Sequence, residues 1–297
     1  MTQEPLDILV PFWGEPALLR ETVASVLAQT DDNWHLTVVD DDYPDPSVAQ
    51  YFADLADPRI TYLRNEQNLG VTGNFRRCLE LASREHVVFL GCDDRLLPQF
   101  VEVVARARRE VPEATIIEVG VQVIDQHGEP VSTLADTVKQ RLFMPRSAGR
   151  QLLSGEELAA SLLRANWLYW PSLVFRRDTL AGKDFRDDLP LIQDLGLIRE
   201  LITDGAVLLL EPEVAFEYRR HLESASVAGL YDGTRFAGER MFFAESAEVM
   251  AAHGWPRAAR AARWHLTSRL HALTLVPAAL RQRDWAAVRG LLRHAVR

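Results

Sequence analysis

Short apolar runs alternate with amphipathic segments over the first 120 residues of the chain. Each apolar run has the length of a buried strand, and apolar residues recur at helical spacing in the segments between them. The predicted strands are 8–11, 35–39, 60–63 and 86–90, and the predicted helices are 18–27, 47–55, 75–81 and 100–109. Apolar strands that alternate with helices predict a parallel sheet covered on both faces, typical of a nucleotide-binding α/β half.

The pattern is less regular after this half. It contains predicted strands at 115–124, 173–175 and 214–218, an apolar run at 206–210, predicted helices at 155–163 and 191–201, and a polar stretch at 136–150. From about Arg235 the pattern is helical to the end of the chain. We expect breaks near residues 254–256 and at Pro277, because glycine and proline interrupt helices.

Composition limits the class of protein. The chain has 297 residues, enough for one large α/β domain or a domain with an appendage. A formal net charge of −9 excludes a general nucleic-acid binder, which needs a basic surface to displace counterions. The chain has only two cysteines, Cys78 and Cys92, which are too few for a disulfide framework and are not spaced as metal ligands. This cysteine content fits a reducing cytosol. No basic leader and no apolar stretch of about 18 residues is present, so we expect neither export nor a membrane span.

Positive charge gathers at the C-terminal end. From Arg257 onward the charged side chains are arginines opposed only by Asp284. At the end of the chain the sequence predicts a helix with apolar residues at helical spacing, namely Trp285, Val288, Leu292 and Val296. Arginines form a row along another face of the same helix. This amphipathic helix either adsorbs to anionic lipid or packs on the rest of the protein with its arginines in solvent, and both interpretations stay open.

Carboxylates follow two of the predicted strands. Asp40 and Asp41 come after the second strand, and Asp93 and Asp94 come after the fourth. In an open α/β sheet the ligand crevice lies beyond the carboxyl ends of the strands, and carboxylates there suit Mg²⁺ or Mn²⁺ bound to a diphosphate. Aspartates after strands are also ordinary turn and helix-capping residues, which is the alternative interpretation.

The order of five short motifs resembles that of family 2 glycosyltransferases. They are Pro11-Phe12-Trp13-Gly14-Glu15, Val38-Val39-Asp40-Asp41, Asn68-Leu69-Gly70-Val71-Thr72-Gly73-Asn74-Phe75, Leu90-Gly91-Cys92-Asp93-Asp94 and Gln193-Asp194-Leu195-Gly196-Leu197. Their joint order over roughly residues 6–225 is far more specific than any one of them. The resemblance implies an inverting enzyme with an α/β GT-A fold, the Rossmann-like mixed sheet of nucleotide-diphospho-sugar transferases flanked by helices.

The resemblance also implies a division of the chain. We expect a catalytic domain over residues 1–225, with a nucleotide-binding half at 1–125 and an acceptor half at 126–225. Residues 226–297 then form a helical, arginine-rich C-terminal extension.

The family comparison implies which residues surround the nucleotide and the donor sugar. These are Pro11, Phe12, Glu15, Asp40, Asp41, Gly70, Asn74, Arg77, Cys92 and Asp93. Asp40 or Asp41 would accept from the base or ribose, and Pro11, Phe12 and Glu15 would border the nucleoside pocket.

Some of these assignments have alternatives. Either Arg76 or Arg77 would face the diphosphate, while the other is a surface arginine. Phe12 and Trp13 are alternatively core aromatics. Gly70 permits a tight turn or a close approach of the backbone to a ligand.

The family's metal motif is commonly Asp-x-Asp, and this chain has Gly91 at its first position and Asp93 at its last. The resemblance implies a divalent cation, Mg²⁺ or Mn²⁺, held by Asp93 and Asp94. His221, in a late motif beginning at Tyr218, is a further candidate ligand and is alternatively a structural histidine. Loss of the first carboxylate leaves metal dependence open.

Asp194 matches the family's catalytic base, and Gln193 stands where glutamate is frequent. An acceptor hydroxyl is a weak acid, so a carboxylate within hydrogen-bond reach must take its proton as the new bond forms. Attack from the face opposite the departing nucleotide inverts the anomeric configuration. A helix-capping role is the alternative for Asp194.

Trp167, Trp170 and Gln193 are the candidate acceptor contacts, because aromatic faces stack on sugar rings. Large rings close together are alternatively part of the core. The expected acceptor is a hydroxyl on a glycan, a lipid-linked saccharide or a small molecule.

The sequence therefore predicts a cytoplasmic glycosyltransferase, alternatively peripheral at the inner face of the membrane. Its product would belong to a cell-surface polysaccharide, a glycolipid or a glycosylated metabolite. A degenerate relative that binds sugar nucleotide or a partner without catalysis is the rival, motivated by Gly91 and Gln193. A nucleotidyltransferase is a weaker rival, since residues 14–15 supply no glycine-rich basic loop.

Overall fold

The computed structural model describes residues 4–132, 143–145, 149–189, 192–220, 234–281 and 283–296. Its strands are β1 (Leu6–Phe12), β2 (Trp34–Asp40), β3 (Ile60–Arg64), β4 (His86–Phe89), β5 (Arg95–Leu96), β6 (Ile116–Ile124), β7 (Gln151–Ser154), β8 (Leu173–Arg176) and β9 (Val207–Arg219). Its helices are α1 (Pro16–Leu27), α2 (Ser47–Leu55), α3 (Gly70–Leu81), α4 (Phe100–Glu110), α6 (Gly155–Arg164), α7 (Gln193–Thr203), α9 (Thr234–Ala252), α10 (Pro256–Trp264), α11 (Leu266–Arg281) and α12 (Trp285–Val296).

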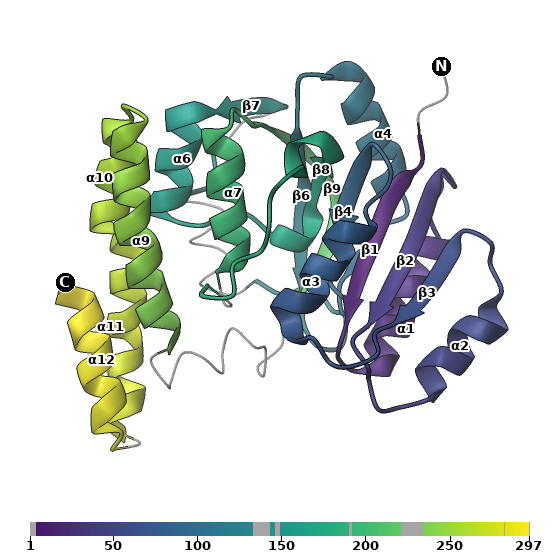
Figure 1. Ribbon diagram of the computed structural model, residues 1–297, viewed down its shortest axis with the longest axis horizontal. Coiled ribbons are helices and arrows are strands. Elements are labelled where there is room, and N and C mark those ends of the chain that lie inside the picture. The colour runs from purple at the N-terminus through teal and green to yellow at the C-terminus, as the bar shows by residue number, and fades with distance from the viewer. Residues whose placement is uncertain are drawn as a thin grey trace.

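The strands form one mixed sheet in the order β3-β2-β1-β4-β8-β6-β9-β5, and β7 also pairs with β9 (Figure 1). The first four strands of this order are parallel. β8 runs antiparallel between β4 and β6, and β9 is parallel to β6. Because β8 is antiparallel to both β4 and β6, β6 runs parallel to β4. β6 and β9 therefore point the same way as β1.

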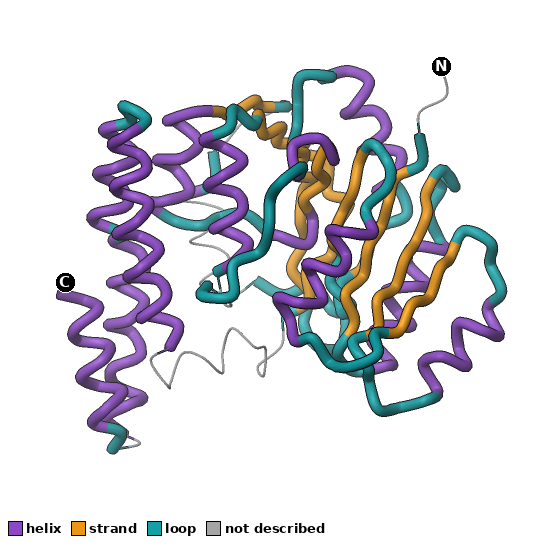
Figure 2. Tube along the Cα trace, viewed as in Figure 1, coloured by secondary structure: helices purple, strands orange, loops and turns teal. Residues whose placement is uncertain are grey.

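Helices cover both faces of this sheet (Figure 2). One face packs against α1, α2 and α4, with Val10, Val38 and Phe100 among the buried residues. The other face packs against α3, α6 and α7. The predicted α/β architecture and every predicted strand and helix are present, and the runs at 206–210 and 214–218 are parts of the single strand β9.

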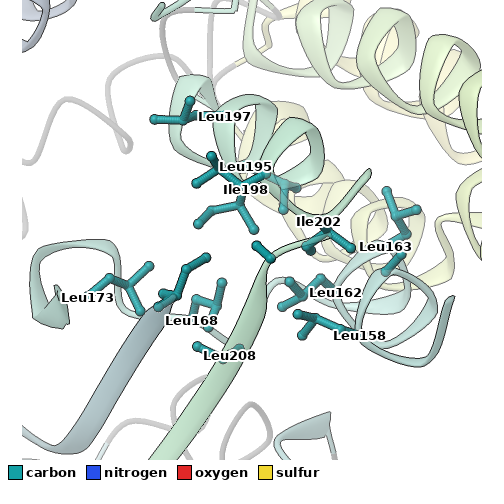
Figure 3. Packing of buried hydrophobic residues seen from close by; sticks show 14 of the residues in the cluster. Leu158, Leu162, Leu163, Leu168, Leu173, Leu195, Leu197, Ile198, Ile202 and Leu208 are labelled. Carbon is teal, nitrogen blue, oxygen red and sulfur yellow. The ribbon is translucent and has the colours of Figure 1, made fainter. Parts of the chain in front are cut away.

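On the second face, α6 and α7 share one hydrophobic cluster with the sheet. Figure 3 shows leucine and isoleucine side chains of both helices, among them Leu162 and Ile198, meeting Leu208 of β9. Leu162, Ile198 and Leu208 are all almost fully buried. This packing fixes the position of α7, the helix that carries Asp194.

The C-terminal extension is not a separate body. Phe242 and Met250 of α9 and Ala258 of α10 belong to the same hydrophobic cluster as α6 and α7. Only α11 and α12, with Phe236 of α9, form a small cluster of their own. The predicted boundary after residue 225 is therefore not a boundary of the hydrophobic core.

The helix breaks agree in part with the prediction. α9 ends before Gly254 and α10 begins at Pro256, as expected. The break expected at Pro277 is wrong, because Pro277 lies inside α11. A proline removes one helical hydrogen bond, but Ala272 and Ala279 on either side of it are buried and hold the helix in place. None of the described helices has the length and hydropathy needed to cross a bilayer.

Candidate functional site

The candidate site lies at the carboxyl ends of β1, β2 and β4. β1 and β2 stay paired as far as Phe12 and Asp40, whereas β4 leaves β1 after Phe89. Pro11, which has no N–H to donate, comes just beyond the point where β4 leaves. The strands therefore diverge where the ligand crevice of an open α/β sheet is expected.

Asp40 is fully buried and organises the turn after β2. One carboxylate oxygen accepts the Tyr43 backbone N–H at 2.7 Å, and the other accepts the Tyr62 hydroxyl at 2.5 Å. Burial, together with the Asp40 carboxylate, raises the pKa of Tyr62, so this phenol remains protonated and keeps donating. Asp40 thus fixes the turn after β2 through its neighbours, and a direct contact with the nucleotide stays a prediction.

Asp41 and Asn74 tie the loop before α3 to the sheet. Asp41 Oδ1 accepts from Asn65 Nδ2 and from the Leu69 N–H, both at 2.8 Å. Asn74 donates to the Val39 carbonyl at 3.0 Å. Both side chains are almost fully buried, so their first role is to hold this loop beside the crevice.

Aromatic rings meet at the same edge. Phe12 is fully buried, which confirms the core interpretation for this ring, and its centroid lies 5.1 Å from that of Tyr43. Trp13 is instead 52% exposed, with its ring 5.3 Å from Tyr43. Glu15, also predicted at the nucleoside pocket, is exposed.

The sulfur of Cys92 approaches the same loop. A Cβ placed on Gly14 would lie 3.4 Å from Cys92 Sγ. Burial raises the pKa of the Cys92 thiol to about 12, and the negative charge of Asp93 is a second, smaller cause of the increase. The thiol is therefore neutral at physiological pH and does not act as a nucleophile here.

The two arginines of α3 have different roles. Arg76 donates to the carboxylate of Asp184 at 2.6 Å and to the Phe185 carbonyl at 2.7 Å. Arg77 is exposed and pairs with Glu80 at 3.0 Å. Arg76 therefore binds the segment that leads to α7, while a contact of Arg77 with the diphosphate stays a prediction. Gly70 begins α3 with a φ of 72°, a conformation that favours glycine.

Asp93 and Asp94 converge on Gly91. A Cβ added to Gly91 would lie 2.4 Å from Asp94 Oδ2 and 3.1 Å from Asp93 Oδ1. Both carboxylates therefore flank the same small space, and residue 91 has no room for a side chain of its own. This packing gives a physical reason for glycine at the first position of the expected Asp-x-Asp motif.

Arg219 at the end of β9 contacts both aspartates. Its backbone N–H donates to Asp94 Oδ1 at 2.8 Å, and its Nε donates to the Asp93 carbonyl at 2.7 Å. The guanidinium also donates to Glu21 of α1 at 2.6 Å and is almost fully buried. The sequence placed Arg219 in a late family motif but gave no signal of this contact, because the partners are 125 or more residues apart.

The electrostatics of the pair favour a cation. Burial raises the pKa of Asp94 well above its usual value, the negative charge of Asp93 raises it further, and Arg219 opposes both effects. A divalent cation would relieve the repulsion between these two carboxylates. Mg²⁺ commonly takes one or two carboxylates plus phosphate oxygens and water, so Asp93 and Asp94 fit such an ion.

A complete protein ligand set is not present in the described part of the chain. Among the described residues, no group of three or more His, Cys, Asp or Glu side chains is placed to hold a metal ion. His221, the third predicted ligand, lies outside the described residues.

Topology brings Asp194 to the same edge of the sheet. α7 ends at Thr203 and β9 begins at Val207, so the short connection makes α7 antiparallel to β9. Since β9 points the same way as β1, the first turn of α7 returns toward the carboxyl ends of the strands, as Figure 1 shows. Asp194 lies in that first turn, where the helix dipole favours a negative charge.

The segment just before Asp194 is anchored at two places. Arg76 holds it at Asp184, as described above. Arg186 donates to both carboxylate oxygens of Glu245 on α9 at 2.7 Å, and Arg199 of α7 donates to the same carboxylate at 2.9 Å. These ion pairs connect the candidate base to both α3 and the C-terminal extension.

The candidate acceptor residues are less accessible than expected. Trp167 is fully buried and its indole N–H donates to Ser161, so it belongs to the core, and the prediction of an acceptor contact is wrong. Trp170 is half-buried and its ring stacks on Phe89 at a centroid distance of 5.9 Å. Gln193 is buried, and its Oε1 has no hydrogen-bond partner within the described structure.

Comparison with known proteins agrees with this architecture. The family model described as "Glycosyl transferase family 2" matches residues 7–147. An uncharacterized protein of Mycobacterium tuberculosis is 29% identical over 227 residues, which are 73% of this chain and 67% of that protein. The putative colanic acid biosynthesis glycosyl transferase WcaA of Escherichia coli is 33% identical over 105 residues, 35% of this chain and 38% of WcaA.

A third relative is named for its reaction. The UDP-Glc:alpha-D-GlcNAc-diphosphoundecaprenol beta-1,3-glucosyltransferase WfgD of Escherichia coli is 34% identical over 89 residues, 30% of this chain and 35% of WfgD. The matched regions thus span less than half of WcaA and of WfgD.

Solved structures of TarS from S. aureus share the fold. TarS 1–349 aligns with a TM-score of 0.68 at 13% identity over 98% of this chain and 81% of that chain. The complex of TarS 1–349 with UDP-GlcNAc aligns with a TM-score of 0.62 over 81% of this chain and 66% of that chain. The fold is therefore GT-A, as in TarS. Residues 7–147 match the model of family 2 of the glycosyltransferases, and the chain is similar to members of that family over this part.

Proposed function

We propose that this protein is an inverting glycosyltransferase that moves a sugar from a nucleotide-diphosphate donor to a hydroxyl acceptor. One observation supports the proposal: Asp93 and Asp94 follow β4, and the first turn of α7, which carries Asp194, returns toward the same end of the sheet. The first two are suited to a cation at a diphosphate, and the third is suited to removing a proton.

The donor is a nucleotide-diphosphate sugar in this proposal. The family and the TarS complexes with UDP and UDP-GlcNAc support this class of ligand. Trp13 offers an exposed ring at the crevice beside Tyr43, and Asp40 and Asp41 hold the loops that border it.

Asp93 and Asp94 would hold Mg²⁺ or Mn²⁺ through their carboxylates. When bound, such an ion supplies positive charge that stabilises the departing diphosphate. Arg219 would help to position the pair, because its N–H donates to the Asp94 carboxylate and its Nε donates to the Asp93 backbone carbonyl.

Asp194 acts as the general base. Its carboxylate accepts the proton of the acceptor hydroxyl while that oxygen bonds to the anomeric carbon, and the bond to the nucleotide diphosphate breaks on the opposite face. The anomeric configuration inverts as a result. Gln193 cannot titrate, so Asp194 is the single base of this pair.

The proposed acceptor is a saccharide of a cell-surface polysaccharide or its lipid-linked precursor. The names of WcaA and WfgD support this class, since one refers to colanic acid and the other to a diphosphoundecaprenol-linked sugar. Glycolipids and glycosylated metabolites are further acceptor classes. We propose a cytoplasmic location, supported by two cysteines that are both free thiols.

A thermal-shift screen of nucleotides and nucleotide sugars, with and without Mn²⁺, tests donor binding. A ligand that binds only the folded protein raises its melting temperature. We expect one family of nucleotide diphosphates to raise it more with Mn²⁺ than without, and slow release of free sugar from the matching donor. No response to any nucleotide would refute the proposal, and binding without release or transfer would identify a degenerate relative.

Two variants separate the roles. Asp194→Asn should abolish sugar transfer while nucleotide stabilisation is kept, and Asp93→Asn should lose the Mn²⁺-dependent part of that stabilisation. Asp54→Asn, which changes an exposed carboxylate on α2, is the matched control and should change neither. Full transfer by Asp194→Asn would contradict the assignment of the base.

A further inference from the structure

Exposed apolar side chains are concentrated on the last three helices. On the described surface, the large apolar residues of this region that are more than about two fifths exposed are Trp264, Leu266, Leu270, Leu273, Leu280, Trp285, Leu292 and Val296. Scattered exposed leucines are ordinary, but a group on neighbouring helices marks an interaction surface.

The leucines of α11 lie on one face. Leu266, Leu270, Leu273 and Leu280 follow one another at spacings of four, three and seven residues, which places them along a single stripe. The buried side chains of α11 are small, namely Ala272 and Ala279. α11 therefore packs inward through these alanines, with Leu275 and Val276 partly buried against the same cluster, and it exposes the four leucines of the stripe.

The structure corrects the apolar face that the sequence predicts for α12. Val288 points inward, and Ala287, Leu291 and His294 are buried with it. The helix thus packs on the protein with one face, as one of the two interpretations predicts. Its other face still exposes Trp285, Leu292 and Val296 beside arginines, so packing on the protein and contact with a partner are compatible.

Charge identifies the chemistry of the partner. Nine arginines oppose one aspartate between Arg257 and Arg297, a formal charge of +8. Since the whole chain carries −9, residues 1–256 carry −17. An anionic surface therefore attracts this end of the molecule and repels the rest.

A second copy of the chain fits this surface poorly. Association of two such faces would bring arginines of the same sign together, as at Arg263 and Arg281 at the two ends of the leucine stripe. A lipid surface with anionic headgroups instead offers phosphates for the arginines and acyl chains for the leucines. Tryptophans such as Trp264 and Trp285 suit the interface between the two layers.

We propose that α11 and α12 bind the protein to the surface of an anionic lipid bilayer. The leucine stripe enters the boundary between headgroups and acyl chains, the two tryptophans lie at headgroup depth and the arginines contact lipid phosphates. The helices lie in the interface and do not cross it, in keeping with the lengths and hydropathies of the described helices.

In Figure 1 the end of α11 and the start of α12 lie on the same side of the molecule as the carboxyl ends of β1 and β2 and the start of α7. This proposal stands on the surface chemistry alone and does not depend on the proposed sugar transfer.

Flotation of the full chain with lipid vesicles tests the proposal. Phosphatidylcholine vesicles with and without about 30% phosphatidylglycerol provide the two surfaces. We expect binding only to the anionic vesicles, weakened by added salt because surface charges are screened. Leu270→Ser with Leu273→Ser should lower the bound fraction roughly tenfold, since the removed side chains lose their transfer into the interface.

Matched controls come from the catalytic part. Leu152 and Val214 have similar exposure, so Leu152→Ser with Val214→Ser should leave binding unchanged. Arg289→Gln with Arg293→Gln should weaken anionic binding, whereas Arg20→Gln with Arg109→Gln, which changes the net charge equally, should not. Equal melting temperatures would confirm that the variants fold.

Two results would overturn the proposal. One is the absence of binding to anionic vesicles, or binding that the leucine substitutions leave intact. The other is a stable dimer of the unmodified chain in sedimentation velocity that Leu270→Ser with Leu273→Ser converts to a monomer, which would assign the face to a second copy.

Discussion

Asp94 occupies the space that a side chain at Gly91 would need. A Cβ at residue 91 would lie 2.4 Å from Asp94 Oδ2. Asp94 is almost fully buried, and the Arg219 N–H holds its other oxygen, so the carboxylate has little freedom to move away. A glycine at this motif position is therefore compatible with an intact site, in which the adjacent Asp94 takes the space of the missing first carboxylate.

Gly91→Ala should lower the free energy of unfolding by about 1–3 kcal/mol, because an added methyl group in a filled space forces its neighbours apart. It should also weaken Mn²⁺-dependent nucleotide binding. Gly290→Ala on α12 is the control, since a Cβ there meets no atom within 4 Å and the helix gains stability. Urea denaturation measures both, and unchanged stability of Gly91→Ala would contradict the packing argument.

Arg219→Met should destabilise the protein by about 1–3 kcal/mol, because the Asp93 and Gln126 carbonyls lose the donor that the buried guanidinium supplies. The ion pair with Glu21 is also lost, but it contributes little because the Glu21 side chain is 46% exposed. Arg20→Met, which changes an exposed arginine of α1, should stay within about 0.5 kcal/mol of the original protein. If chemical denaturation gives equal values for the two variants, Arg219 does not stabilise the carboxylate pair.

Glu245→Ala should both destabilise the protein and slow sugar transfer. Arg199 would lose its carboxylate partner while nine-tenths buried, a loss of about 2–4 kcal/mol, and the segment before Asp194 would lose one anchor. Nucleotide binding should be unchanged, because Glu245 lies on α9, away from the strand ends. Glu248→Ala on the exposed side of α9 is the control, and a similar loss of transfer there would point to general damage to the helix.

Acid should weaken the C-terminal helices through His294. Burial lowers the pKa of His294 to about 4 from an ordinary value of 6.5, although Glu239 opposes the shift. The unfolded chain therefore binds this proton at a higher pH than the folded chain. Stability is full above about pH 6.5 and falls as the pH drops toward 4, by on the order of 1–3 kcal/mol.

Denaturation of the His294→Gln variant at pH 7.5 and pH 5 checks this sign. The variant should lose less stability between the two values than the original protein does. His127→Gln, at an exposed histidine, should reproduce the original pH dependence. An unchanged pH dependence in His294→Gln would exclude this histidine as the cause.

The hydrophobic pattern was sufficient for most elements of this fold, because those strands and helices have a local period, but it did not predict the short strands β5 and β7. The same pattern placed Asp93 and Asp94 after β4 and Asp194 at the head of a helix, as found. It did not predict the inward turn of Val288, since residues on both sides of α12 are apolar and only tertiary packing chooses between them.

The sequence did not predict the contacts between distant segments, for a different reason. Arg76 and Arg77 are neighbours of the same type, and only the position of Asp184, far along the chain, decides which one is an anchor. Trp167 and Trp170 likewise share one motif, but the first points into the core and the second toward its edge. Residue type was predictive where the role is local, and uninformative where a partner many residues away selects it.

The hydrophobic core extends from the sheet into α9 and α10, and this limits where the chain can be truncated for expression. A fragment that stops after β9 would leave solvent against the surfaces of α6 and α7 that Phe242 and Met250 now cover. Such a fragment should aggregate or melt at low temperature, even though it retains every motif of the family. Fragments for crystallisation or enzymology should therefore extend at least through Trp264, the last residue of α10.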